Sequence, residues 1–105
     1  MPVRSGRLEK RIQLAVPVQI SSILDPAATE RTTTENVCSL GIRVLAERAR
    51  DLDERLMVSS LMGELRALAC VVYCQRLADG RFGIGLRFQG QPYNWPKSSL
   101  GGAVA

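Results

Sequence analysis

The order of apolar and polar residues along the chain predicts short β-strands and no helix. Residues 81–88 show it most clearly, because Phe82, Ile84, Leu86 and Phe88 alternate with small or charged residues. This period of two is typical of a strand with one buried face. Five further runs of β-branched, threonine-rich or apolar residues have the same character and are separated by turn residues. The predicted strands occupy residues 13–22, 29–37, 42–47, 56–61, 65–77 and 81–88.

Two of these strands have features that bear on their place in a sheet. Pro17 has no amide hydrogen for a ladder, so the first strand is expected at an edge or with a bulge. In the fifth strand, residues 69–74 are apolar on both sides, so the pattern does not show which set faces inward. A regular strand places Cys70 and Cys74 on one face, roughly 13 Å apart at ~3.3 Å per residue, which is too far for a disulfide.

The segments between the strands are short and polar. Asp79-Gly80 is a specific hairpin signal, and residues 48–55 form a charged connector that we expect to be a solvated loop. Beyond Gly90 the periodicity is lost, and we expect the chain to fray after about Trp95, whose indole is expected to pack at the domain rim. Short strands, tight turns and no amphipathic helix predict an all-β antiparallel barrel or sandwich.

The chain length and the distribution of charge predict one domain preceded by a basic N-terminal arm. At 105 residues, of which 46% are hydrophobic, the chain has room for a single core. Residues 1–12 are polar and basic and are expected to form a flexible N-terminal arm. Residues 13–90 are expected to form the barrel, and residues 91–105 an irregular C-terminal tail.

The charge of the chain is carried by arginine. The formal net charge is +4, and twelve arginines stand against two lysines. Guanidinium groups form bidentate hydrogen bonds with phosphate and with the acceptor edge of guanine. The composition therefore favours an anionic or nucleotide partner, although solubility alone explains the charge equally well.

The residue types that most often carry chemistry are scarce. The chain has no histidine, which removes the commonest general base, the commonest metal ligand and any histidine-activated nucleophile. Its three cysteines have no zinc or redox spacing. We therefore expect a binding protein rather than an enzyme, with no catalytic residue, no metal site and no cofactor.

The sequence offers no segment that would take the chain into or across a membrane. The first seven residues have no apolar run typical of a signal peptide, and no stretch is long and uncharged enough to span a bilayer. With an odd number of cysteines, a reduced cytoplasmic protein without membrane insertion is expected.

Two motifs together point to a ligand. Arg7 and Arg11 form an R-x-x-x-R pair before the first strand, and Asn36, Cys38 and Gly41 form N-x-C-x-x-G between the second and third strands. Each is weak alone, since a solvated basic arm and ordinary turn chemistry explain them. Their order, with the strands between them and a closing G-x-G-x-x-F strand, resembles the PilZ domain, whose pattern is R-x-x-x-R followed by [D/N]-x-[S/A]-x-x-G. The resemblance covers roughly residues 7–88.

The resemblance implies a six-stranded antiparallel β-barrel that binds the bacterial second messenger cyclic di-GMP. Arg7 and Arg11 would grip guanine or phosphate from the arm, and Asn36 would accept hydrogen bonds from guanine. Gly41 would let the backbone pass close to the ligand. Cys38 departs from the serine or alanine of the pattern. It is small enough to fit, but a thiol is a poorer hydrogen-bond donor, which weakens a phosphate contact.

These residues suit three functions to different degrees. The first is a cyclic di-GMP receptor or adaptor whose arm changes conformation on binding and which signals to a protein effector. The alternative is a degenerate PilZ-like protein-interaction module that binds no nucleotide, which Cys38 favours. A barrel for single-stranded nucleic acid would need aromatic stacking platforms, and the chain has few aromatic residues. We therefore expect no DNA or RNA partner.

Overall fold

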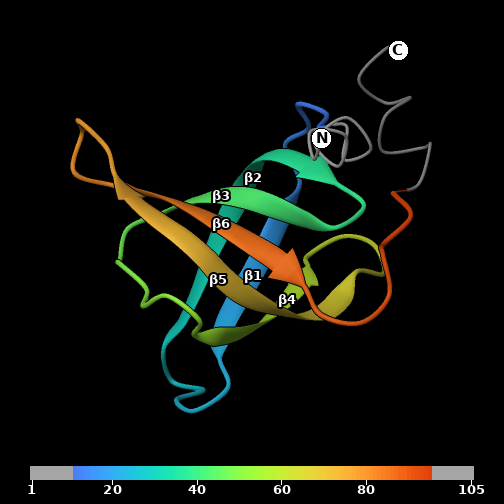
Figure 1. Ribbon diagram of the computed structural model, residues 1–105, viewed down its shortest axis with the longest axis horizontal. Coiled ribbons are helices and arrows are strands. Elements are labelled where there is room, and N and C mark those ends of the chain that lie inside the picture. The colour runs from blue at the N-terminus through green and yellow to red at the C-terminus, as the bar shows by residue number, and fades with distance from the viewer. Residues whose placement is uncertain (1–10, 96–105) are drawn as a thin grey trace, which may run out of the picture.

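The computed structural model describes residues 11–95, which form an all-β, six-stranded antiparallel barrel (Figure 1). Around the closed barrel the strands follow the order β1-β2-β3-β6-β5-β4. Their bounds are β1 Pro17–Ser22, β2 Thr29–Cys38, β3 Gly41–Ala46, β4 Arg55–Ser60, β5 Arg66–Arg76 and β6 Phe82–Phe88. The predicted succession of strands is confirmed. The strand pattern alone allowed a barrel or a sandwich, and the closed sheet is the six-stranded barrel that the PilZ resemblance implies.

The barrel interior is filled by the apolar residues that alternate along the strands. In β6, Ile84, Leu86 and Phe88 are buried as predicted. They belong to one core cluster that also contains aliphatic side chains from each of the other five strands. A barrel of this size has just enough interior for such side chains. The fully buried large residues are Val18, Ile20, Val37, Ile42, Val44, Leu56, Val58, Val71, Ile84 and Leu86.

The first strand begins later than predicted, at Pro17 instead of residue 13. The preceding residues run beside β2 through a few specific bonds. Thr34 is the main anchor: its amide donates to the Val16 carbonyl (3.0 Å), and its hydroxyl accepts from the Val16 amide (2.9 Å) and donates to the Leu14 carbonyl (2.6 Å). The expected edge position or bulge is wrong, because β1 pairs with both β2 and β4 without a register shift. Pro17 is accommodated at the first position of its strand, where a missing amide hydrogen disrupts no ladder.

Two β-bulges shape the face of the barrel formed by β2, β3, β6 and β5. In β2 the register shifts between Thr34 and Asn36, and in β5 it shifts between Val71 and Tyr73. Each bulge inserts one residue without a partner on the neighbouring strand. The β5 bulge turns two consecutive side chains, Val72 and Tyr73, toward solvent.

The β5 bulge also overturns one prediction about the cysteines. Cys70 pairs with Arg87, whereas Cys74 pairs with Ile84 and packs against the core. The inserted residue shifts the alternation by one, so the two cysteines lie on opposite faces of β5 and not on the same face. All three cysteines are free thiols.

The charged connector between β3 and β4 is not simply a solvated loop, because Arg50 is buried within it. Its guanidinium lies 3.9 Å from a carboxylate oxygen of Glu30 and 3.6 Å from one of Glu54, and it donates to the Ala28 carbonyl (3.4 Å). Arg50 therefore ties this connector to the loop between β1 and β2. Most of the other connector residues are exposed, as predicted.

The segment after β6 closes one end of the barrel. Tyr93 and Trp95 pack against Phe88, with the Tyr93 and Trp95 ring centroids 4.7 Å apart. The Trp95 indole nitrogen donates to the Cys38 carbonyl (2.8 Å), and the Tyr93 amide donates to the Ser39 carbonyl (2.8 Å). Trp95 thus packs at the rim, as expected. The predicted fraying beyond it lies outside the described residues.

Candidate ligand-binding face

Four of the five predicted site residues come together on one side of the barrel. A pair of main-chain hydrogen bonds, both 2.9 Å, joins Ile12 to Val37. This bridge places Arg11 beside β2, where its Nη1 donates to the Oδ1 of Asn36 at 2.6 Å. Arg11 and Asn36 are 25 residues apart in the chain. Arg7 lies outside the described residues.

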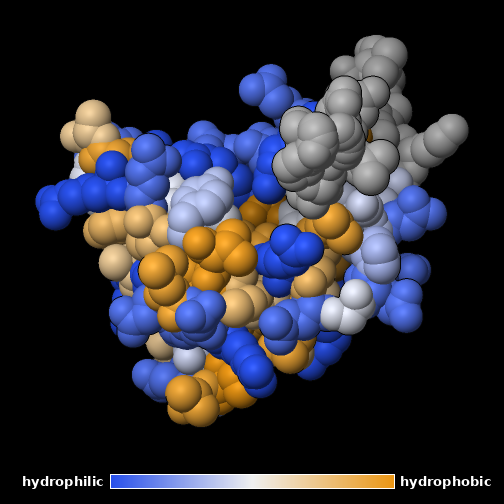
Figure 2. Space-filling view, viewed as in Figure 1, coloured by the Kyte–Doolittle hydropathy of each residue, from blue (hydrophilic) through white to orange (hydrophobic). Residues whose placement is uncertain are grey.

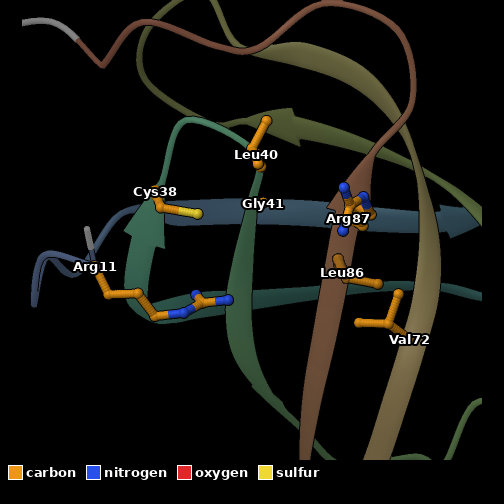
Figure 3. A pocket seen from close by; sticks show the side chains of 7 residues that line it. All are labelled: Arg11, Cys38, Leu40, Gly41, Val72, Leu86 and Arg87. Carbon is orange, nitrogen blue, oxygen red and sulfur yellow. The ribbon is translucent and has the colours of Figure 1, made fainter. Parts of the chain in front are cut away.

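A small open pocket adjoins this contact. It has a volume of about 120 Å³ and is lined by Arg11, Cys38, Leu40, Gly41, Val72, Leu86 and Arg87. Figure 3 shows Arg11 reaching from the segment before β1 toward β3. Arg87 lies on β6, on the other side of β3. Small-molecule sites commonly measure about 300–1,000 Å³. The pocket therefore has room for part of a nucleotide, such as a phosphate or one edge of a base.

Gly41 is required by the barrel itself. A Cβ at this position would overlap the carbonyl oxygen of Leu86 on β6. Gly41 also pairs directly with Arg87 in the ladder between β3 and β6. The missing side chain therefore allows two strands to approach closely, a reason independent of any ligand.

Cys38 belongs to the wall of the pocket. The residue is only 3% exposed, and its carbonyl is held by the Trp95 indole. Figure 3 shows its side chain directed across toward β3 near Gly41. The position accordingly favours a small residue, which agrees with the serine or alanine of the sequence pattern.

A second group of polar side chains crosses the same face next to the pocket. Asn36, Arg43, Gly85 and Tyr73 are successive register partners across β2, β3, β6 and β5. Arg43 Nε donates to Glu35 (2.6 Å), and its Nη1 donates to the Tyr73 hydroxyl (3.0 Å) and to Gln75 (3.3 Å). The hydrogen bond with Glu35, followed by that with Tyr73, raises the pKa of Arg43 above its ordinary value.

The two glycines of β6 allow this group to lie close to the sheet. A Cβ at Gly83 would overlap the Arg43 guanidinium, and a Cβ at Gly85 would overlap the Tyr73 ring. The side chains therefore cover the glycine backbone. Figure 2 shows apolar side chains in the middle of the face over β5 and β6, with hydrophilic ones around them. Val72, at 50% exposure, is the exposed aliphatic residue of β5.

The sequence motifs did not identify Arg87, Val72, Arg43 or Tyr73. One signal was present: Gly83, Gly85 and Arg87 alternate with the large apolar residues of β6, so Arg87 had to face outward. Tyr73 and Val72 gave no such signal, because their orientation depends on the bulge. Across residues 11–95, no group of three or more cysteine or acidic side chains is placed to hold a metal ion.

Comparison with known proteins adds information on the fold. No protein-family model matches the sequence, and the search of curated proteins found no relative. Among solved structures, the chain is similar to the inhibitor of motility MotI/DgrA of Bacillus subtilis, with a TM-score of 0.70 and 18% sequence identity. The match covers 99% of this chain and 55% of that protein, so the chain spans little more than half its length. The fold is a PilZ-like barrel.

The PilZ-like barrel gathers groups suited to recognition. Arg11 and Arg87 carry positive charge at the pocket, Asn36 offers an amide, and Tyr73 offers an aromatic face. Guanidinium and amide groups form paired hydrogen bonds with phosphates and base edges. Within residues 11–95, no helix is long and apolar enough to cross a membrane.

Proposed function

We propose that this domain is a cyclic di-GMP receptor and that the ligand binds at the pocket beside Arg11 and Asn36. The observation that carries the proposal is the 2.6 Å hydrogen bond between these residues. It joins the two motifs, which are separated by a strand in the sequence, at the edge of a pocket that also contains Cys38, Gly41 and Arg87. The PilZ-like fold supports the same assignment.

The chemistry of the pocket suits a doubly charged guanine dinucleotide. Arg11 binds the O6 and N7 acceptors of a guanine or one phosphate, and the Asn36 amide reads the base edge. Arg87 adds a second positive charge for a phosphate. Because the pocket takes only part of such a ligand, the remainder lies across the open face. Arg7 is proposed to cover it from the N-terminal side.

Ligand binding has to replace the contact between Arg11 and Asn36. The Asn36 oxygen accepts a hydrogen bond from Arg11, and the pair is exposed. A hydrogen bond to a charged group contributes about 1.5–3 kcal/mol, and exposure to water places this one at the low end. The ligand can therefore compete for both side chains, and the residues before Ile12 change position as a result.

We further propose that this change is read by a protein effector in the cytoplasm. Amide hydrogen exchange of residues 4–12, compared with and without saturating cyclic di-GMP, tests the conformational part. Slower exchange on binding supports it, and unchanged exchange would rule out the switch while leaving ligand binding in place.

Calorimetric titration with cyclic di-GMP tests binding itself. Arg11→Ala and Asn36→Ala are each expected to weaken affinity about tenfold or more, since a bidentate contact with a base contributes about 1–3 kcal/mol. Arg7→Ala is expected to act similarly. Arg31→Ala is the matched control, because Arg31 is an exposed arginine of β2 and lies outside the pocket. Wild-type protein that is folded but gives no binding would reject the proposal.

The second candidate is a PilZ-like interaction module that binds no nucleotide. Cys38 in place of serine or alanine favours it, as does the mutual pairing of Arg11 and Asn36. Titration of Cys38→Ser distinguishes the two. Tighter binding than wild type identifies a receptor weakened by its thiol, and an absence of binding to both proteins identifies the interaction module.

A further inference from the structure

We propose that Tyr73 forms a stacking shelf for the second purine base of a ligand whose first base binds at the Arg11–Asn36 contact. This inference rests on the proposed function, since it assigns the second half of the same ligand. Asn36 and Tyr73 are separated by three steps of the register, from β2 to β3, β6 and β5. At about 4.8 Å per strand, their backbones are roughly 14 Å apart, and the Tyr73 ring leans from β5 over Gly85 of β6, toward the Asn36 side.

The Tyr73 ring lies against the backbone of β6. Its atoms lie so close to Gly85 that a Cβ there would come within 2.6 Å of both Cδ2 and Cζ. The ring therefore rests on the bare backbone of β6. The residue is 37% exposed, so part of the ring remains open to solvent. A fixed aromatic surface loses little conformational entropy when a ligand binds.

Arg43 is the positioning residue for this ring. Its Nη1 donates to the Tyr73 hydroxyl (3.0 Å), and its carbon Cζ lies 5.6 Å from the ring centroid. Glu35 holds the guanidinium from the opposite side at 2.6 Å. The side chain of Arg43 is 20% exposed, which leaves it mainly occupied by these partners. Arg43 thus fixes the phenol at both its hydroxyl and its ring.

The shelf is continuous with the pocket. Val72 lines the pocket together with Arg11, and Tyr73 follows it directly in the chain. The β5 bulge exposes both side chains on the same outer face. A ligand with one base anchored at Arg11 and Asn36 would therefore meet Val72 and then the Tyr73 ring. A mononucleotide has one base and cannot place a base at both positions.

Substitution of Tyr73 separates stacking from a purely structural cover over Gly85. Tyr73→Phe keeps the aromatic face and loses the hydroxyl, whereas Tyr73→Leu keeps an apolar cover and loses the ring. By calorimetry with cyclic di-GMP, Tyr73→Phe is expected to remain within about threefold of wild type. Tyr73→Leu is expected to bind about tenfold more weakly, since base–aromatic stacking contributes about 1–3 kcal/mol. The preference for cyclic di-GMP over GMP should fall by a similar factor.

Each outcome decides the inference. If wild type binds and Tyr73→Leu binds equally well, the shelf is overturned while the receptor assignment stands. If Tyr73→Phe weakens binding as much as Tyr73→Leu, the hydroxyl network and not stacking is responsible. Wild type that does not bind overturns both proposals. Should Tyr73→Leu fail to fold, the Tyr73 ring signals of the wild-type protein decide by NMR: no shift at saturation with cyclic di-GMP overturns the shelf.

Discussion

Arg43 and Arg50 are close in the sequence and both pair with glutamates, but they serve different parts of the molecule. Arg43 lies on the outer face, and its Nε is 2.6 Å from Glu35. Arg50 is inside the β3–β4 connector, and its side chain is only 4% exposed. Its two ion pairs are long, at 3.9 and 3.6 Å, and its Nε has no hydrogen-bond partner among residues 11–95. Arg50 therefore joins loops, whereas Arg43 positions a group that a ligand can reach.

This contrast shows that the number of arginines alone says little about what each of them does. All arginines contribute equally to the net charge. Arg50, however, is buried between loops, whereas Arg11 and Arg87 lie at the pocket on the outer face. Replacing Arg50 should affect the stability of the fold, and replacing Arg43 should affect mainly the ligand-binding face. Four substitutions test this contrast, with effects that decrease in the order given.

Arg50→Ala is expected to have the largest effect. It leaves the mostly buried Glu30 without its positive partner, and breaking a buried pair costs about 3–5 kcal/mol. Because the pairs are long, we expect the free energy of unfolding in urea to fall by about 3 kcal/mol. Arg48→Ala, at an exposed site of the same connector, is the control and should change it by less than about 0.5 kcal/mol. A loss below about 1 kcal/mol for Arg50→Ala would contradict a structural role.

Gly41→Ala is expected to follow. Its Cβ would meet the Leu86 carbonyl, which is backbone and cannot rotate aside, so β3 and β6 would have to separate. Overpacking of this kind costs about 1–3 kcal/mol, measurable by thermal unfolding. Gly83→Ala is the comparison, because its Cβ meets only the end of the flexible Arg43 side chain. If both variants lost equal stability, close strand approach would not be the reason for Gly41.

Arg43→Gln is expected to show the reverse of the pattern at Arg50. The loss of a partly exposed pair should lower the free energy of unfolding by less than about 1 kcal/mol. The affinity for cyclic di-GMP should fall a few fold, because the Tyr73 ring loses both the donor to its hydroxyl and the guanidinium beside it, and is held less firmly. Urea denaturation and calorimetry on the same variant measure both quantities. A large loss of stability with unchanged affinity would place Arg43 with Arg50 as a structural residue.

Arg81 at the β5–β6 hairpin supplies the exposed reference and the smallest effect. The Arg81 amide, followed by its guanidinium, donates to Asp79 and lowers the pKa of that carboxyl below its usual range. A carboxyl whose pKa is lowered by folding adds stability above its unfolded pKa, and this is lost as the pH falls through the folded value. Arg81→Ala should raise the Asp79 pKa only part of the way back to its ordinary value, because the hydrogen bond from the main-chain amide of residue 81 remains. Carboxyl titration by NMR measures it, and an unchanged pKa would refute the side-chain contribution.

Much of the barrel could be predicted because β6 alternates so regularly. Phe82, Ile84, Leu86 and Phe88 gave its inward set, and turn residues marked the strand ends. The fifth strand resisted prediction, since apolar residues on both sides carry no period. Its orientation comes from pairing with β6 and from one inserted residue, which are tertiary effects. The late start of β1 has a similar cause, because Thr34 bonds the preceding segment through its side chain.

The site was predicted in part for comparable reasons. Arg11, Asn36, Cys38 and Gly41 could be named from motif order; Arg11, Cys38 and Gly41 line one pocket, and Asn36 is hydrogen-bonded to Arg11 at its edge. Ligand binding by these residues and by Arg7 stays a prediction. Tyr73 and Val72 were missed because a bulge exposes them. Arg50 was assigned to a solvated loop because no local pattern reveals that Glu30, from a distant strand, lies beside it.

The main-chain bridge between Ile12 and Val37 has a geometric consequence for any ligand. It fixes the chain before β1 to the barrel at Ile12. Arg7 is five residues before Ile12, and a fully extended chain spans at most about 3.6 Å per residue, so the backbone of Arg7 stays within roughly 18 Å of that point. The bridge thus limits how far from Ile12 the backbone of Arg7 can reach. Inserting residues between Arg7 and Ile12 would widen the circle of surface that Arg7 can sweep while leaving the barrel unaltered.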